Sequence, residues 1–194
     1  MCMAGSLFGD PHILTLDGLG YTFNGLGEFT LIESDEFTLQ GRMVQAINGD
    51  GDLAQGTVFS AIVAEDSSSG SVQFQVTADG NLETMVDRKL VTFFDEIPEA
   101  SFGSIAVTAQ GNNTFEVTFA SGVFLEVRAE NGIISQLIVV LPDSFSGQTT
   151  GLMGNHNEDQ SDDFMPRNGS NTIPIDSSHE DIHNMFGVTC KSNR

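Results

Sequence analysis

Residues 105–141 read IAVTAQGNNTFEVTFASGVFLEVRAENGIISQLIVVL, and this stretch decides the fold class. β-branched and aromatic residues recur with polar ones in short runs, which is the pattern of half-buried β-strands. The runs are separated by Gly111-Asn112-Asn113, Ser121-Gly122 and Asn131-Gly132, whose glycine and asparagine residues suit tight hairpin turns. Strands that follow one another at such short intervals are expected to pair in an antiparallel sheet.

The same pattern is found earlier in the chain, over residues 38–44, 72–77 and 90–94. It predicts an all-β protein, an antiparallel β-sandwich, whose core is built from many of its 15 phenylalanines. The serine-rich residues 65–71 are expected to form a flexible loop tip.

We expect one short helix near the C-terminus, over residues 177–186. Ser177 or Ser178 would cap it, and Ile182, Met185 and Phe186 would share its apolar side.

Composition narrows the possible partners. The 27 acidic residues outnumber the 7 basic ones, so the net charge of -20 disfavours nucleic acids and anionic membrane surfaces. No apolar run approaches the ~20 residues that a membrane-spanning helix needs, and we expect no direct membrane insertion. Residues 1–8 are too short and uncharged for a secretory signal. We therefore expect 1–194 to be one domain cut from a longer protein.

An acidic loop, GNHNEDQSDDF at residues 154–164, is the first candidate site. Its carboxylate and amide oxygens are the hard ligands that Ca²⁺ prefers, and the carboxylates would repel one another without a cation. The spacing of Asn155, Asn157 and Asp159 resembles the start of an EF-hand loop, but Pro166 stands where the closing glutamate would be. The alternative is a solvated turn held by local hydrogen bonds.

Two features favour the secretory pathway. Cys2 and Cys190 lie at opposite ends of the chain, where a disulfide would join the termini of one domain; the alternative is two unpaired thiols. Asn112-Asn113-Thr114 and Asn168-Gly169-Ser170 are acceptor sequences for N-glycosylation at Asn112 and Asn168.

A zinc-protease pattern also occurs, with His179, Glu180 and His183 in the predicted helix. A zinc-dependent hydrolase would need a third protein ligand and a cleft beside a second subdomain. The chain has only His12 and His156 as further histidines, and the helix is short and terminal. We therefore treat a zinc-dependent hydrolase as a disfavoured alternative.

The N-terminal part carries a second set of motifs: Phe8-Gly9-Asp10-Pro11-His12, Thr15-Leu16-Asp17-Gly18 and Tyr21-Thr22-Phe23-Asn24-Gly25. Together with Gly151-Leu152-Met153-Gly154-Asn155-His156-Asn157, this order resembles the von Willebrand factor type D domain. The resemblance spans about residues 8–190. Phe29 and Met153 stand where secreted gel-forming members carry cysteines, so the chain is most similar to the cysteine-poor domains of membrane-bound mucin-like and sushi-domain-containing surface proteins.

The resemblance implies a calcium site that joins the two ends of the domain. Its ligands would be side chains from both motifs and the main-chain carbonyl of Asp159; the side chains are those of Asp17, Asn155, Asn157, Asp162 and Asp163. The ion would stabilise the fold by closing a long loop. Without the resemblance, Asp17-Gly18 would be interpreted as a turn.

The resemblance also implies self-cleavage between Asp10 and Pro11, which occurs in some members of the family. The Asp10 carboxylate can attack its own carbonyl, proline nitrogen is a good leaving group once protonated, and His12 is placed to donate a proton. The alternative is that this element is only a turn. Because cleavage would be a single event, we expect no enzyme in the ordinary sense.

The sequence thus predicts an extracellular or cell-surface, calcium-binding structural and interaction module of a mucin-like or adhesive protein. Its expected partners are other domains of the parent protein or extracellular proteins.

Overall fold

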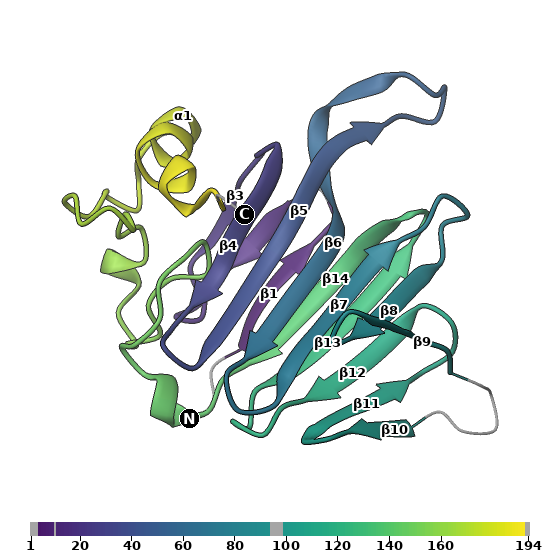
Figure 1. Cartoon of the computed structure of the whole chain (residues 1–194). Helices are drawn as coiled ribbons and strands as arrows, with labels where there is room; N and C mark the ends of the chain where they lie inside the picture. The colour runs from purple at the N-terminus through teal and green to yellow at the C-terminus, as the bar shows by residue number, and fades with distance from the viewer. Residues whose placement is uncertain (1–3, 10, 94–98, 193–194) are drawn as a thin grey trace.

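The computed structural model describes residues 4–9, 11–93 and 99–192. Within these ranges, fourteen strands belong to one hydrogen-bonded antiparallel network (Figure 1). In chain order they are β1 (Ala4–Phe8), β2 (His12–Leu14), β3 (Gly20–Thr22), β4 (Gly27–Glu33), β5 (Phe37–Ile47), β6 (Leu53–Asp66), β7 (Gly70–Val76), β8 (Leu82–Val86), β9 (Lys89–Val91), β10 (Glu99–Phe102), β11 (Ile105–Ala109), β12 (Thr114–Thr118), β13 (Phe124–Glu130) and β14 (Ile133–Val140).

The network folds back on itself into two layers. One layer has the order β10-β11-β12-β13-β14-β1-β2-β3, and the other has the order β4-β5-β6-β7-β8-β9. They are joined where Ile134 of β14 pairs with Phe59 of β6. The layers face each other across aromatic contacts, with the Phe74 and Phe115 ring centroids 5.6 Å apart. The prediction of an all-β antiparallel sandwich is therefore confirmed.

Alternation along the strands creates the core between the layers. On β13, Leu125, Val127 and Ala129 are buried, while the residues between them point outward. Phenylalanine supplies many of the largest fully buried side chains, as the composition predicted. The buried apolar residues from both layers form one cluster.

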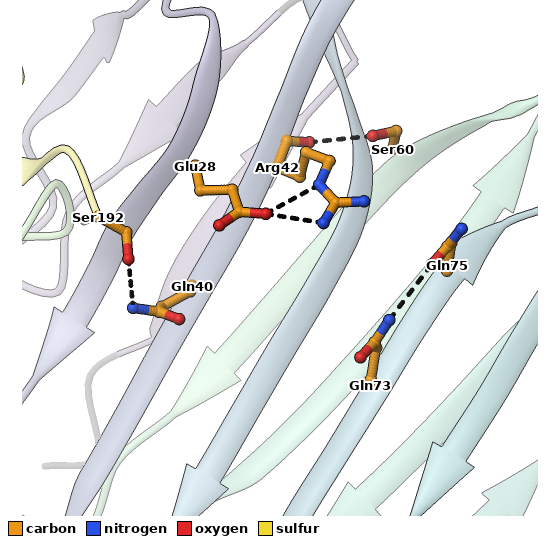
Figure 2. Close-up of polar contacts among 7 residues, drawn as sticks. All are labelled: Glu28, Gln40, Arg42, Ser60, Gln73, Gln75 and Ser192. Atoms are coloured by element: carbon orange, nitrogen blue, oxygen red, sulfur yellow. Dashed lines mark hydrogen bonds and ion pairs between the residues drawn. The ribbon is translucent and has the colours of Figure 1, made fainter. Parts of the chain in front are cut away.

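Polar side chains lie on part of the outer face of the second layer (Figure 2). On it, Arg42 of β5 forms an ion pair with Glu28 of β4, with 2.7 Å between Nη2 and Oε1. Gln40 of β5 donates a 3.1 Å hydrogen bond to Ser192, which holds the C-terminal segment against this layer. The layer is thus buried on one face and hydrated on the other, the usual condition of an antiparallel sheet.

The expected loop over residues 65–71 is wrong at both ends. Asp66 ends β6 and Gly70 begins β7, so only a tight turn lies between them. Asp66 is buried, and its Oδ1 accepts hydrogen bonds from the Ser68 and Ser69 hydroxyls at 2.7 Å. The serine-rich composition therefore serves to close a hairpin by side-chain hydrogen bonds.

The C-terminal helix is present in a distorted form. Ser178 caps α1 (His179–Asp181) by accepting a 3.1 Å hydrogen bond from the Asp181 amide. The chain continues as a π-helical turn, η3 (Ile182–Phe186), and a 3₁₀ turn, η4 (Gly187–Cys190). Two further 3₁₀ turns lie earlier, η1 (Asp143–Phe145) and η2 (Gln160–Asp162).

Packing explains the position of this helical segment and corrects one expectation. Ile182 and Phe186 are buried as predicted, and Phe186 contacts Phe164 with ring centroids 5.1 Å apart. Met185 is 56% exposed, so its predicted place on the apolar side was wrong. The π geometry changes the number of residues per turn, which turns Met185 away from the face that Ile182 and Phe186 share.

Candidate metal centre

The acidic loop and the first motif meet in space. Asp17 follows β2, and its buried carboxylate accepts hydrogen bonds from the backbone amides of Asn157, at 3.1 Å, and Glu158, at 2.8 Å. The Gln160 side chain donates a 2.9 Å bond to the Asp17 carbonyl. Asp17 therefore fixes a loop about 140 positions further along the chain.

Asp163 lies beside Asp17 and is more deeply buried, with 1% of its surface exposed. Its Oδ2 accepts a 2.6 Å hydrogen bond from the Thr15 hydroxyl, and its Oδ1 has no hydrogen-bond partner among the described residues. Burial raises the pKa of Asp163 to about 7; the Thr15 hydrogen bond and, more weakly, the Asn155 backbone amide oppose this rise, and the neighbouring Asp17 charge adds to it. Among the described residues, no positively charged side chain contributes to this shift of the Asp163 pKa.

The remaining side chains surround Asp162. Asn155 Nδ2 donates to Asp162 Oδ1 at 2.8 Å, and Asn157 Nδ2 donates to Asp162 Oδ2 at 3.0 Å. Asn155 Oδ1 is buried and has no hydrogen-bond partner within the described part of the chain. Five of the predicted ligand side chains, Asp17, Asn155, Asn157, Asp162 and Asp163, are therefore brought into one cluster.

Asp159 has a different orientation. Its exposed carboxylate accepts bonds from the backbone amide and the hydroxyl of Ser161, and its own amide donates to Asn157 Oδ1 at 2.8 Å. These bonds shape the turn into η2, and the two from Ser161 lower the pKa of the Asp159 carboxyl. Its side chain thus stabilises the local turn, and the ligand predicted from Asp159 is its main-chain carbonyl.

The oxygen set fits a hard cation. Two buried oxygens without partners among the described residues, Asn155 Oδ1 and Asp163 Oδ1, lie in a loop that also holds three further carboxylates, those of Glu158, Asp159 and Asp162. Within residues 4–9, 11–93 and 99–192, no group of three or more His, Cys, Asp or Glu side chains is arranged to hold a metal ion. A cation at this loop would therefore depend on amide and main-chain oxygens as well, which suits calcium and not zinc.

Three residues of this centre were not predicted from the sequence. Thr15 binds Asp163, and Gln160 binds the Asp17 carbonyl. Gly154 has a φ of +79°, and a Cβ there would lie 1.9 Å from Asp163 Oδ1, so only glycine fits. Two of them could have been identified from their positions in the sequence. Thr15 stands two positions before Asp17 in the first motif, and Gly154 is the first residue of the acidic loop.

The Asp10-Pro11-His12 element is described only in part, since Asp10 lies outside the described residues. Pro11 is buried, and its carbonyl accepts a 3.0 Å hydrogen bond from the Phe23 amide. His12 is exposed, and its Nδ1 lies 2.9 Å from the Thr22 hydroxyl. The imidazole is therefore held in place by a side chain on the neighbouring strand β3.

The zinc-protease pattern does not form a metal centre here. The His183 ring stacks on Phe23 with centroids 5.2 Å apart, and the backbone changes from α to π geometry between His179 and His183. Both histidines and Glu180 line a shallow groove of about 260 Å³. This arrangement gives no support to a zinc-dependent hydrolase.

The predicted covalent sites lie elsewhere. Cys190 is fully buried, and burial raises the pKa of its thiol to about 12. Cys2 lies outside the described residues, so the pairing of the two cysteines stays a prediction. Asn112 and Asn168 are both exposed in loops, as glycan acceptors must be.

Comparison with known proteins places this architecture in a family. The model of the von Willebrand factor type D domain matches residues 5–170, which include both motifs of the centre. The chain belongs to the von Willebrand factor type D domain family. The resemblance inferred from the motifs is therefore confirmed, and the matched span begins within β1 and ends after the acidic loop of the type D domain.

Several proteins that contain related sequences are known. Sushi domain-containing protein 2 of Homo sapiens is 31% identical over 186 residues, which cover 94% of this chain and 22% of that protein. Mucin-4 of Homo sapiens is 34% identical over 200 residues, covering 96% of this chain and 4% of that protein. Protein mesh of Bombyx mori is 30% identical over 207 residues, which cover 97% of this chain and 13% of that protein.

The type D domain thus spans less than a quarter of each of these three relatives. In the part of the chain that the structure describes, no helix has the length and apolar character needed to cross a membrane.

Proposed function

We propose that this type D domain is an extracellular, calcium-binding structural module of a mucin-like or adhesive surface protein, where it contacts other domains of its parent or extracellular proteins. The observation that carries the calcium assignment is a pair of buried oxygens beside the Asp17 carboxylate, Asn155 Oδ1 and Asp163 Oδ1, which have no hydrogen-bond partner in the described part of the chain. The membership of mucins and a sushi-domain protein in the same family supports the structural role.

Electrostatics gives the physical reason for a cation. Asp17 and Asp163 are both buried, and the nearby Asp17 charge is one of the causes that raise the pKa of Asp163. Two buried carboxylates at close range cannot both ionise at little cost. A bound Ca²⁺ supplies the charge that lets both ionise, and it gives the unpartnered oxygens a ligand role.

The chain's own residues would hold the ion through the side chains of Asp17, Asn155, Asn157, Asp162 and Asp163 and the main-chain carbonyl of Asp159. In the hydrogen-bonded loop, the Nδ2 atoms of Asn155 and Asn157 donate to Asp162, so the Asp162 carboxylate would exchange a hydrogen bond for the ion on binding. Because Asp17 and the loop are far apart in sequence, the ion would stabilise the folded chain preferentially.

Calorimetric titration with Ca²⁺ and thermal melts with calcium or a chelator test this proposal. Wild-type protein is expected to bind calcium and to melt at a higher temperature in its presence. Asp162→Ala should lose both effects. Asp159→Asn is the matched control, because that exposed side chain serves the turn and not the ligand set; equal calcium shifts in the wild type and Asp162→Ala would contradict the proposal.

A second candidate function is self-cleavage, favoured by the hydrogen bond that holds His12 against Thr22. The Asp10 carboxylate would attack its own carbonyl carbon, the bond to the Pro11 nitrogen would break, and that nitrogen would take up a proton. Water would then open the resulting cyclic anhydride, so no other reactant is needed.

Intact mass of the reduced protein tests the cleavage, after incubation at mildly acidic and at neutral pH. We expect loss of the segment that ends at Asp10, and no loss in Asp10→Asn. Thr22→Val should slow cleavage by freeing the His12 ring while leaving calcium binding unchanged. An uncut wild-type chain under all conditions would show that the element is only a turn.

A further inference from the structure

A cavity of about 370 Å³ opens between the two layers of the sandwich, where β8 and β9 face the β11–β12 hairpin. Its volume lies at the lower end of the ~300–1,000 Å³ usual for small-ligand sites. Phe93 and Phe115 provide aromatic surface, with ring centroids 5.4 Å apart, and Glu83, Thr84 and Asn112 are polar residues of the lining. The cavity therefore joins an apolar wall to polar groups.

One polar group in its wall lacks a partner. Thr84 is 2% exposed, and its Oγ1 makes no hydrogen bond within the described residues. Buried hydroxyls are nearly always hydrogen-bonded in folded proteins. The Oγ1 atom itself is enclosed, and rotation of the Thr84 side chain about χ1 would turn its hydroxyl toward a polar ligand in the cavity.

The exposed Asn112 lines the same cavity. It lies in the hairpin loop between β11 and β12, and the next residue, Asn113, accepts a 3.2 Å hydrogen bond from the Leu82 amide on β8. This bond crosses from one layer to the other and fixes the loop beside the cavity. Asn112 is also the acceptor residue of Asn112-Asn113-Thr114, whereas Asn168 does not line this cavity.

We propose that this cavity seats the first sugar of an N-linked glycan attached to Asn112, an inference that rests on the proposed extracellular placement. In the attachment step, Asn112 Nδ2 would bond to the anomeric carbon of a lipid-pyrophosphate-linked oligosaccharide. The bond from that carbon to the pyrophosphate oxygen breaks, the lipid pyrophosphate leaves, and the amide loses one proton.

The chemistry of a pyranose fits the wall. Its ring has an apolar face that can pack on Phe93, which is only partly buried in the free protein. Its hydroxyl and acetamide groups offer partners to Glu83 and to the unpartnered Thr84 hydroxyl. The glycan would thereby cover the open end of the sandwich.

Native-state digestion by endoglycosidase H tests the seat, using secreted protein that carries oligomannose glycans. Ser170→Ala leaves Asn112 as the one acceptor, and Thr114→Val leaves Asn168. We expect native Asn112 glycan to be cut at least about tenfold more slowly than native Asn168 glycan, with the difference lost after denaturation. Adding Phe93→Ala should restore rapid cutting at Asn112.

The outcomes test the binding of the first sugar in the cavity separately from the extracellular placement of the protein. Three results would overturn the binding of the sugar in the cavity and leave the proposed function standing. They are equal digestion rates for the two native glycans, a slow rate at Asn112 that Phe93→Ala leaves unchanged, and sugar on Asn168 alone. Absence of sugar from both asparagines would overturn the seat and also count against the extracellular placement. If Phe93→Ala is not secreted, Glu83→Gln provides the second variant, and it should likewise accelerate cutting at Asn112.

Discussion

Thr15 donates a 2.6 Å hydrogen bond to Asp163, which lies 148 positions further along the chain. The bond joins the turn after β2 to the end of the acidic loop, and it is buried at both ends. It is one of the bonds by which the first motif and the loop form a single centre.

Thr15→Val should destabilise the calcium-free protein. The substitution keeps the shape of the side chain but leaves Asp163 without its donor, so we expect a loss of about 1–3 kcal/mol in the free energy of unfolding. Urea denaturation with a chelator present measures it. Thr118→Val, at an exposed position on β12, is the control and should change stability little; an equal effect of both variants would mean that the buried bond contributes nothing.

Stability should depend on pH in the calcium-free protein. Burial raises the pKa of Asp163 to about 7, above its unfolded value, so the folded state binds the extra proton between about pH 4 and pH 7. Its contribution is therefore fully present below pH 4 and is lost as the pH rises through 7. Denaturation of chelator-treated wild type and Asp163→Asn across this pH range isolates the effect, because the variant has no carboxyl at this position to titrate. If the free energy of unfolding changes with pH in the same way for both proteins, the prediction is refuted.

Gly154→Ala should disrupt the centre more than an ordinary glycine substitution. Its φ is +79° and the new Cβ would lie 1.9 Å from Asp163 Oδ1, so both backbone strain and a clash are expected. Gly169→Ala, with a φ of +77° and open space within 4 Å of where its Cβ would lie, shows strain alone, which costs about 1–2 kcal/mol. We expect a larger loss for Gly154→Ala, together with weaker calcium binding; equal losses would show that the clash relaxes freely.

Thiol titration tests the predicted disulfide. If Cys2 and Cys190 are paired, denatured protein without reductant should show no free thiol, and two should appear after reduction. If they are unpaired, the burial of Cys190 and the raised pKa of its thiol should keep it unreactive until the protein unfolds. Two thiols in denatured, unreduced protein would therefore contradict the pairing.

Much of the fold followed from local sequence pattern. The predicted strands at residues 105–109 and 114–119 correspond to β11 and β12, the second being one residue shorter than predicted, and the Asn131-Gly132 turn joins β13 to β14 with positive φ at both residues. Such features could be predicted because alternation and turn chemistry depend on neighbouring residues. β6 (Leu53–Asp66) was missed, although it is the strand through which the second layer joins the first.

By itself, the sequence determined the β class, the hairpin order and the family, and it named the acidic residues that gather around Asp17. Only the tertiary structure decided that Thr15 and Gly154 belong to that centre, that Asn155 and Asp163 keep oxygens without partners among the described residues, and that Met185 faces solvent. The physical reason is that alternation and turns arise between neighbours in the chain. Hydrogen-bond partners and buried charge instead depend on segments that pack together from distant parts of the sequence.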